Sequence, residues 1–440
     1  MSRFDEAISA GEADSAFECL RPFTRVVLAV SGGPDSLALL YLAADWRRRL
    51  GANGPALSVV TVDHGLRAEA AHEAAYVAQL ATGLGLAHQT LHWTGDKPRT
   101  GLPNAARSAR YALLDAHVQS IAQGGCAAIV TAHHQDDQAE TFFMRLARGG
   151  GVDALAAMTG DRVLSGTSPV RLLRPLLAFS KARMIASLVK AGVIWIDDPT
   201  NSDVSFERAR VRAALDASGL EAAPLAMTAR RMREARAGLA YAMLHFKPTL
   251  ALDLNGGVFA RFERRAFDDG PRILRQMVVS ELIGAFGGAS RPPELSEIEA
   301  LAVRLEAPDE IAVTLGGAMI SAGMRYVRVW REPGRLSVPE LTLTAGQRQL
   351  WDERFWVGYD GDAATAVKVG PLGRAGYDAI AADVADRFRP PAGAAYGLPA
   401  FFADGALLAV PALGLAPGFT AMRLTPDLER LTVVCDPVEG

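Results

Sequence analysis

One short stretch near the N-terminus, Ser31-Gly32-Gly33-Pro34-Asp35-Ser36, most constrains what this chain of 440 residues can fold into. The apolar run before it, 25–30, predicts a short buried strand, and Pro34 is typical of the first position of a helix. The two glycines allow left-handed backbone angles and bring several N–H groups to one point. Because the positive end of the helix dipole lies there too, we expect the turn to bind an anion.

Asp35 narrows the choice of anion. A carboxylate beside a bound phosphate repels it unless a divalent cation lies between them, so the turn indicates a magnesium nucleotide. The turn has neither the Walker spacing G-x-x-x-x-G-K-[ST] nor the dinucleotide spacing G-x-G-x-x-G. It resembles the PP-loop, the pyrophosphate-binding motif of enzymes that adenylate a substrate. The alternative is a plain strand-to-helix turn in which Asp35 caps the helix.

Short apolar runs alternate with longer amphipathic ones between residues 25 and 196. The expected strands are 25–30, 57–62, 87–93, 127–132 and 193–196. The expected helices are 35–50, 70–84, 105–123, 136–148 and 181–191. This alternation predicts an α/β fold with a parallel sheet and helices on both faces. Ligands of such sheets bind at the carboxyl ends of the strands, so the residues after each strand are the candidates for a site.

Polar side chains follow two of these strands. Asp63 and His64 come after the second strand, and the run His133-His134-Gln135-Asp136-Asp137-Gln138-Ala139-Glu140 comes after the fourth. A helix from about residue 135 places Asp136 and Glu140 on one face. These acids can hold Mg²⁺ or an ammonium group, or they can simply favour the positive end of their helix. A zinc site at the two histidines is disfavoured, because adjacent side chains rarely point the same way.

Arginines recur at helical spacing, as at Arg107 and Arg110, and are densest between 208 and 236. The net charge of −3 argues against a uniformly basic surface but allows a local RNA-binding strip. The alternative is a solvated helix surface. Three widely spaced cysteines without a C-x-x-C motif argue against disulfides and a local zinc or iron–sulfur site.

No signal peptide is visible at the N-terminus, and the most apolar late stretch, 406–419, is broken by prolines and a glycine. We therefore expect a cytoplasmic protein with no membrane partner. After the α/β region, helical patterns at 225–244, 271–286 and 294–305 precede two strands within 310–329, and short apolar runs fill the rest. These patterns predict three domains: a catalytic one (1–215), a mainly helical one (216–330) and a β-rich one (331–440).

Six motifs in this order closely resemble those of the tRNA(Ile)-lysidine synthetases, PP-loop ATPases of bacteria. They are Ser31–Ser36, VDHGLR at 62–67, AHHQDDQAET at 132–141, Arg148-Gly149, RPLL at 174–177, and DPTN with FER within 198–208. The resemblance covers roughly the first half of the chain. Ala132, Pro103 and Ala209 depart from the family pattern, which has Gly, Glu and Asn there.

The resemblance implies a ligase that uses ATP and Mg²⁺. The 2-carbonyl oxygen of the wobble cytidine in the CAU anticodon of tRNA(Ile) attacks the α-phosphate of ATP, and pyrophosphate leaves. The amino group of free L-lysine, through its ε-amine, then displaces AMP and yields lysidine. The family's C-terminal domains help to clamp the tRNA acceptor arm, and the resemblance allows a homodimer.

The resemblance also implies three sets of site residues. The ATP-binding set is Ser31, Gly32, Gly33, Pro34, Asp35, Ser36, His64 and His133. The catalytic set is Asp35, Asp63, Asp136, Asp137 and Glu140, in which Asp35 and Asp136 hold Mg²⁺ and Asp63, Asp137 and Glu140 grip lysine. The tRNA-binding set is Arg107, Arg110, Arg148, Arg174, Arg208 and Arg212.

Two alternatives remain at this point. Another PP-loop enzyme, such as one that thiolates cytidine in tRNA, usually needs C-x-x-C cysteines, which this chain lacks. A nucleotide- or RNA-binding module without turnover has no physical reason to keep several acids together at a strand exit.

Overall fold

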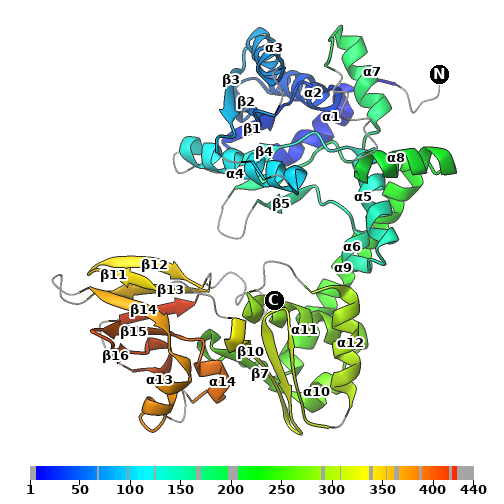
Figure 1. Cartoon of the computed structure of the whole chain (residues 1–440). Coiled ribbons are helices and arrows are strands. Elements are labelled where there is room, and N and C mark those ends of the chain that lie inside the picture. Colours follow the sequence, from blue (N-terminus) through cyan, green and yellow to red (C-terminus); the bar gives the residue numbers. More distant parts are fainter. Residues whose placement is uncertain are drawn as a thin grey trace, which may run out of the picture. The chain divides into compact units, whose positions relative to one another are not determined.

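The computed structural model describes residues 6–66, 69–95, 97–98, 100–122, 125–164, 170–196, 207–288, 293–307, 309–335, 340–352, 354–360, 366–385, 389–415 and 419–423. The chain divides into two compact units, Met1–Arg236 and Ala237–Gly440 (Figure 1). Helix α9 (Ala222–Thr249) runs through the division, and it confirms the single long helix predicted around 225–244.

A six-stranded sheet forms the centre of the first unit, in the order β3-β2-β1-β4-β6-β5. Neighbouring strands are parallel except for β5, which runs antiparallel to β6. The strands are β1 (Arg25–Ala29), β2 (Ala56–Asp63), β3 (Ala87–His92), β4 (Ala127–Val130), β5 (Asp161–Val163) and β6 (Arg171–Leu173).

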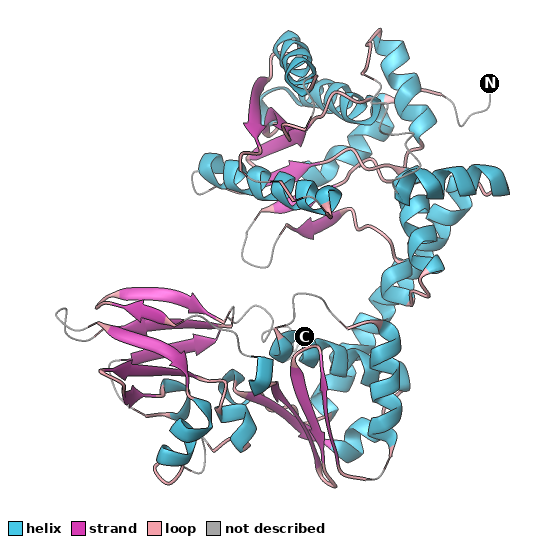
Figure 2. Ribbon diagram, viewed as in Figure 1, coloured by secondary structure: helices cyan, strands magenta, loops and turns pink. Residues whose placement is uncertain are grey.

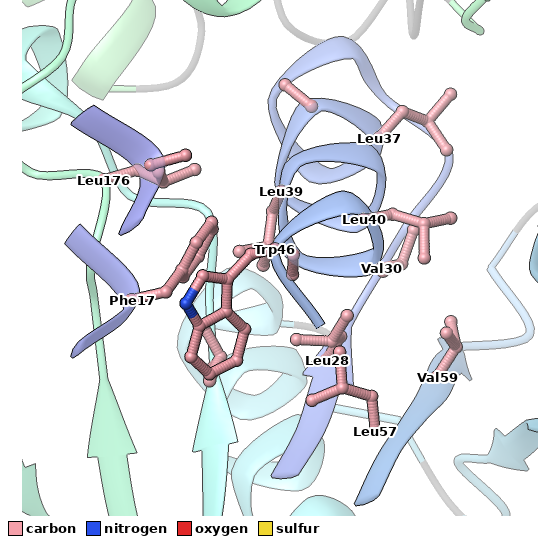
Figure 3. Close-up of a cluster of buried hydrophobic side chains, with 14 of the residues drawn as sticks. Phe17, Leu28, Val30, Leu37, Leu39, Leu40, Trp46, Leu57, Val59 and Leu176 are labelled. Carbon is pink, nitrogen blue, oxygen red and sulfur yellow. The ribbon is translucent and has the colours of Figure 1, made fainter. Parts of the chain in front are cut away.

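Helices cover both faces of this sheet, as predicted. Helices α1 (Ala10–Phe17), α2 (Pro34–Leu50), α3 (Ala70–Gly83) and α7 (Lys181–Ala191) pack on one face, and α4 (Leu102–Ala122) packs on the other. Helices α5 (Gln135–Ala147), α6 (Val152–Leu155) and α8 (Glu207–Ser218) follow β4 in the chain, and α6 and α8 contact α5. Side chains alternate across a strand, so Val26 and Leu28 of β1 face the core beneath α2, whereas Val27 faces the core beneath α4. In the first core the rings of Phe17 and Trp46 pack 5.6 Å apart and join α1 to α2 (Figure 3).

The strand order creates a crevice at one place on the sheet edge. From β1 the chain moves outward to β2 and β3, then returns to the other side of β1 to form β4. The helices after β1 and β4 therefore start from neighbouring strands on either side of a topological switch point, where ligands of open α/β sheets bind. The fold thus brings the loop 31–36 and the acids after β4 to one edge.

In the first unit the structure differs from the predicted elements in three places. Residues 193–196 form no strand: the N–H of Ile196 instead donates to the carbonyl of Gly32, and Trp195 packs on the core beneath α2. The antiparallel pair β5–β6 was not predicted, because its three-residue strands are too short to show a period. The short helix α1 was also missed.

The second unit contains two hydrophobic cores. Figure 2 shows the helices and strands of this unit. In the first core, α11 (Arg272–Gly287) and α12 (Leu295–Glu306) pack on an antiparallel sheet of order β7-β10-β9-β8. Its strands are β7 (Phe259–Glu263), β8 (Ile311–Leu315), β9 (Ala318–Ala322) and β10 (Tyr326–Arg331), and α10 (Arg264–Asp268) follows β7. The two strands predicted within 310–329 are therefore three.

The second core of this unit lies among two small sheets, β11-β14-β15-β16 and β12-β13-β17. The strands are β11 (Leu341–Leu343), β12 (Gln347–Trp351), β13 (Phe355–Tyr359), β14 (Val367–Pro371), β15 (Pro399–Ala403), β16 (Ala406–Ala409) and β17 (Phe419–Arg423). Helices α13 (Gly373–Ile380) and α14 (Ala392–Ala395) complete it. In the part of the chain that the structure describes, no helix has the length and apolar character needed to cross a membrane.

Candidate active site

The loop between β1 and α2 is shaped by Gly32 and Ser36. Gly32 has φ +93°, and a Cβ there would lie 3.3 Å from Cδ1 of Ile196. The hydroxyl of Ser36 accepts the N–H groups of Ser31 (3.1 Å) and Gly32 (3.2 Å) and lies 2.9 Å from the carbonyl of Gly33, to which it donates. Two N–H groups of the loop are thus bonded to the Ser36 hydroxyl in this structure, and binding of an anion by the turn stays a prediction.

Three carboxylates surround the buried imidazole of His134, the residue after which α5 begins. Nε2 lies 3.5 Å from Oδ2 of Asp35 and 3.6 Å from Oδ2 of Asp137, and Nδ1 lies 3.4 Å from Oδ2 of Asp136. Burial alone would lower the pKa of His134, but contacts with Asp136 and Asp35 and the charge of Asp137 raise it to about 10. At neutral pH His134 is therefore a cation among acids.

His134 also caps α5. Its N–H donates to Oδ2 of Asp137 (3.0 Å), and the N–H of Asp136 lies 3.2 Å from Nδ1. A protonated Nδ1 cannot accept that bond, so in the charged ring it donates to the Asp136 carboxylate. The same carboxylate accepts the N–H of Lys181 at the start of α7 (2.9 Å). Burial opposes ionisation of Asp35 and Asp136, but both lie beside His134, which lowers their pKa values.

His133 has a different hydrogen-bond partner from His134. Its Nδ1 lies 2.8 Å from the hydroxyl of Thr131, and burial, together with the charges of Arg174 and Arg208, lowers its pKa to about 3 against the opposing charge of Asp137. The ring nearest the acids is therefore that of His134, which the sequence analysis did not include among the site residues. Its position as N-cap was the available signal, because a cap side chain turns back toward the first turn of its helix.

Glu140 and Asp137 meet arginines from α8. The side chain of Glu140 is 3% exposed, and its Oε1 lies 2.7 Å from Nη2 of Arg212, while Asp137 lies 3.3 Å from Arg208. Burial alone would lower the pKa of Arg212, but its bond to Glu140 and the charges of Glu140, Asp137 and Asp35 raise it. Oε2 of Glu140 is shut off from water and has no hydrogen-bond partner among the described residues.

The exit of β2 makes separate contacts. Oδ1 of Asp63 accepts the N–H of Gly65 (2.7 Å), and Oδ2 lies 3.4 Å from Nδ1 of His92 at the end of β3. His64 is half-buried against the edge of Trp93, and burial and the charge of Arg110 lower its pKa. Among the described contacts, none joins Asp63 to the acids around His134. Arg67, and residues 198–206 of the last motif, lie outside the described residues.

The six predicted tRNA-binding arginines fall into three places. Arg107 and Arg110 lie over the ring of Tyr111 on α4, and the charge of the buried Arg174 acts on the same phenol. Arg208 and Arg212 pair with the acids described above. Arg148 is exposed and pairs with Glu207.

A magnesium ion suits two acids of the His134 cluster, Asp35 and Asp136. Oδ1 of Asp35 is buried without a hydrogen-bond partner in the described part of the chain. No group of three or more His, Cys, Asp or Glu side chains among the described residues is arranged to hold a metal alone. Mg²⁺ commonly takes only one or two carboxylates and completes its shell with phosphate oxygens and water. Asp35 and Asp136 fit that requirement.

Known proteins resemble this chain in sequence. Residues 6–217 match the family model of the PP-loop domain. A tRNA(Ile)-lysidine synthase of Bradyrhizobium diazoefficiens is 44% identical over 354 residues, which cover 74% of this chain and 95% of the relative. Relatives with the same name occur in Rhodopseudomonas palustris (43% over 344 residues, covering 75% and 97%) and Ruegeria pomeroyi (38% over 411 residues, 91% of each).

Proposed function

Because the chain belongs to the tRNA(Ile)-lysidine synthase family, we propose that it adenylates C2 of the wobble cytidine in the CAU anticodon of tRNA(Ile) and then joins lysine there. In the first step the 2-carbonyl oxygen bonds to the α-phosphorus of ATP and pyrophosphate leaves. In the second, an amine of lysine bonds to C2, the C2–O bond breaks, and AMP leaves with the oxygen.

One observation carries this proposal: Oδ2 of Asp35, at the start of α2, lies 3.5 Å from Nε2 of His134, at the start of α5. The phosphate loop and the acids of α5 therefore share a single site. The N-termini of two helices also meet there, which favours the negative charge of a polyphosphate.

For adenylation, the loop Ser31–Ser36 would bind the polyphosphate through its N–H groups, with Asp35 and Asp136 holding Mg²⁺. When bound, the ion would neutralise charge that develops on the leaving pyrophosphate. His133 and His64, with pKa values lowered by burial, stay neutral at pH 7 and can accept or donate hydrogen bonds to the nucleotide.

For the second step, lysine must be oriented with its attacking amine unprotonated. Glu140 and Asp137 supply buried negative charge, and Oε2 of Glu140 is an acceptor without a partner among the described residues. We propose that they grip the cationic groups of lysine and that Asp137 or Asp63 accepts the proton. Before lysine binds, Arg208 and Arg212 would neutralise the negative charges of Asp137 and Glu140.

The remaining arginines of the predicted set would contact the RNA backbone, which favours guanidinium donors.

We also propose that residues 1–215 form the catalytic domain and that 216–330 and 331–440 contact tRNA, a division that the separate cores of the second unit support. We place the protein in the cytoplasm, where its substrates are made. Light scattering of the purified chain would decide whether it forms a homodimer.

The test is incubation of the chain with ATP, Mg²⁺, radiolabelled lysine and a tRNA(Ile) transcript bearing the CAU anticodon. We expect label in the RNA, dependent on ATP and absent with a transcript whose wobble base is U. Unlabelled RNA alongside cytidine thiolation with a sulfur donor would favour the thiolating alternative. RNA binding without AMP release would favour the module without turnover.

A further inference from the structure

A pocket with several charged side chains lies on the face of the sheet that α4 covers, opposite the face that α2 covers. It has a volume of about 430 Å³ and opens between α4 and the segment that contains β5. Arg107, Tyr111 and Asp115 of α4 line it, together with Arg162 of β5. Arg162 lies on β5, and the sequence did not predict the antiparallel pair β5–β6. The sequence therefore gave no sign that Arg162 lies near the arginines of α4.

Four guanidinium groups surround one phenol in this pocket. The guanidinium carbons of Arg107 and Arg110 lie 5.2 Å from the ring centre of Tyr111, and that of Arg162 lies 5.8 Å away. Burial alone would raise the pKa of Tyr111, but the charges of Arg110, Arg107, Arg174 and Arg162 lower it. The ring is thus covered by cations and is not free to stack on a base.

In the described part of the chain, arginines outnumber carboxylates in and around this pocket. Among the described residues, no carboxylate forms an ion pair with Arg107, Arg110, Arg162 or Arg174, and Asp115 is the acid that lines the pocket with them. Nε of Arg110 and Nε of Arg174 are buried and lack hydrogen-bond partners in the described residues, whereas the hydroxyl of Tyr111 interacts with the side chain of Arg174. Buried donors without acceptors are rare in proteins, so an anion with several acceptor oxygens suits this place.

We propose that this pocket binds a phosphodiester group of the RNA backbone beside the target nucleotide, with Arg162 and Tyr111 as binding residues. The proposal rests on the proposed function, because it takes RNA as the substrate. Guanidinium groups bind phosphate oxygens through paired N–H donors, and the phenol adds a further donor. The charges of Arg110 and Arg174 lower the pKa of His133, so these two arginines lie near the strand exit that carries the proposed site.

ATP also carries phosphates, but the loop proposed to bind them lies on the α2 side of the sheet, so ATP is not the expected occupant of this pocket. The phosphate loop leads into α2, whose side chains belong to the core on one face of the sheet, whereas α4 covers the other face. RNA that enters at the carboxyl edge reaches the α4 side without displacing the polyphosphate.

The experiment measures binding of a fluorescent CAU anticodon stem–loop to the full-length chain at several salt concentrations. Arg162→Gln should weaken binding about tenfold at low salt and make the slope of log K against log salt shallower by about 0.7, the value for one phosphate contact on a single strand. Tyr111→Phe should weaken binding at all salt concentrations by a similar factor. Binding of ATP, followed by equilibrium dialysis, should not change in either variant.

The matched control is Arg48→Gln, which removes one exposed charge near the C-terminal end of α2. Equal RNA affinities and slopes for Arg162→Gln and Arg48→Gln would overturn the proposal, as would loss of ATP binding with RNA binding intact. If the wild-type chain binds the stem–loop but never incorporates lysine, the proposed function fails while the RNA pocket stands. If lysine is incorporated normally and Arg162→Gln binds RNA like the wild type, only the pocket fails.

Discussion

Nη2 of Arg212 on α8 lies 2.7 Å from Oε1 of Glu140 on α5, although 72 residues separate them in the chain. The pair places a fixed cation against an acid that is proposed to receive the cationic substrate. Since Oε2 of the same carboxylate is buried without a partner among the described residues, Arg212 occupies one oxygen and leaves the other for a ligand. We therefore propose that Arg212 acts on lysine binding through Glu140.

Removing Arg212 should destabilise the first unit. Arg212→Gln leaves the Glu140 carboxylate buried without its counter-charge, and we expect a loss of about 1–3 kcal/mol in the free energy of unfolding. Urea titration measures this loss. Glu140→Gln in the same background should recover part of the stability but none of the lysine incorporation. Arg230→Gln, at an exposed pair with Glu234, is the control and should change little. Equal free energies of unfolding for Arg212→Gln and the control would show that the Arg212–Glu140 pair does not stabilise the fold.

The His134 cluster predicts a pH dependence of stability in the absence of nucleotide and metal. The folded pKa of His134, about 10, lies above its ordinary value of 6.5, so its contribution to stability is fully present below pH 6.5. That contribution is lost as the pH rises toward 10, by at most about 1.4 kcal/mol per pH unit. Urea titrations between pH 6.5 and 9.5 with EDTA should show this decline in the wild type. His134→Gln should lack it, and parallel curves for the two proteins would refute the protonated ring.

The two loop glycines should respond differently to alanine. Gly32 has φ +93° and a neighbour 3.3 Å from the added Cβ, whereas Gly33 has φ −72° and only the Ser31 hydroxyl, 4.0 Å away. Gly32→Ala should therefore cost about 1–2 kcal/mol of stability and Gly33→Ala little. Thermal denaturation of the two variants side by side measures the difference. Equal melting temperatures would mean that the loop adapts without strain.

Thr61 of β2 forms a hydrogen bond with the backbone of Val30, the residue directly before the loop Ser31–Ser36. Its hydroxyl is buried, donates to the carbonyl of Val30 (2.9 Å) and lies 2.9 Å from Nε2 of His88. Thr61→Val keeps the shape but leaves that carbonyl without its donor, which should cost about 1–2 kcal/mol and raise KM for ATP. Thr61→Ser, which retains the hydroxyl, should keep KM near the wild-type value. A normal KM for Thr61→Val would rule out a positioning role.

The sequence predicted the centre of the first unit well, for a physical reason. Strands β1 and β4 are buried on both faces and appear as continuous apolar runs, and β2 is mostly buried, whereas β3 lies at the edge of the sheet and is more polar. Glycine and proline mark the turn before α2. Residues 193–196 are also apolar, but they pack on the core beneath α2 without forming a strand. Their backbone hydrogen bond, from the N–H of Ile196, goes to the carbonyl of Gly32. Apolar pattern alone does not distinguish these outcomes.

Side-chain partners within the site were less accessible to prediction. The sequence placed both His133 and His134 after β4, but which ring faces the acids depends on the cap geometry of α5. The pairing of Arg208 and Arg212 with Asp137 and Glu140 depends on how α8 packs against α5, and arginines at helical spacing look the same whether they face solvent or a buried acid.

The most direct test of the account is tRNA-dependent exchange of radiolabelled pyrophosphate into ATP, measured without lysine. The account assigns Asp35 of the phosphate loop to adenylation together with the acids of α5. Asp35→Ala should therefore abolish exchange while leaving tRNA binding intact. Asp45→Ala, at an exposed position of the same helix, is the control and should exchange like the wild type. Exchange by Asp35→Ala at the wild-type rate would contradict the account.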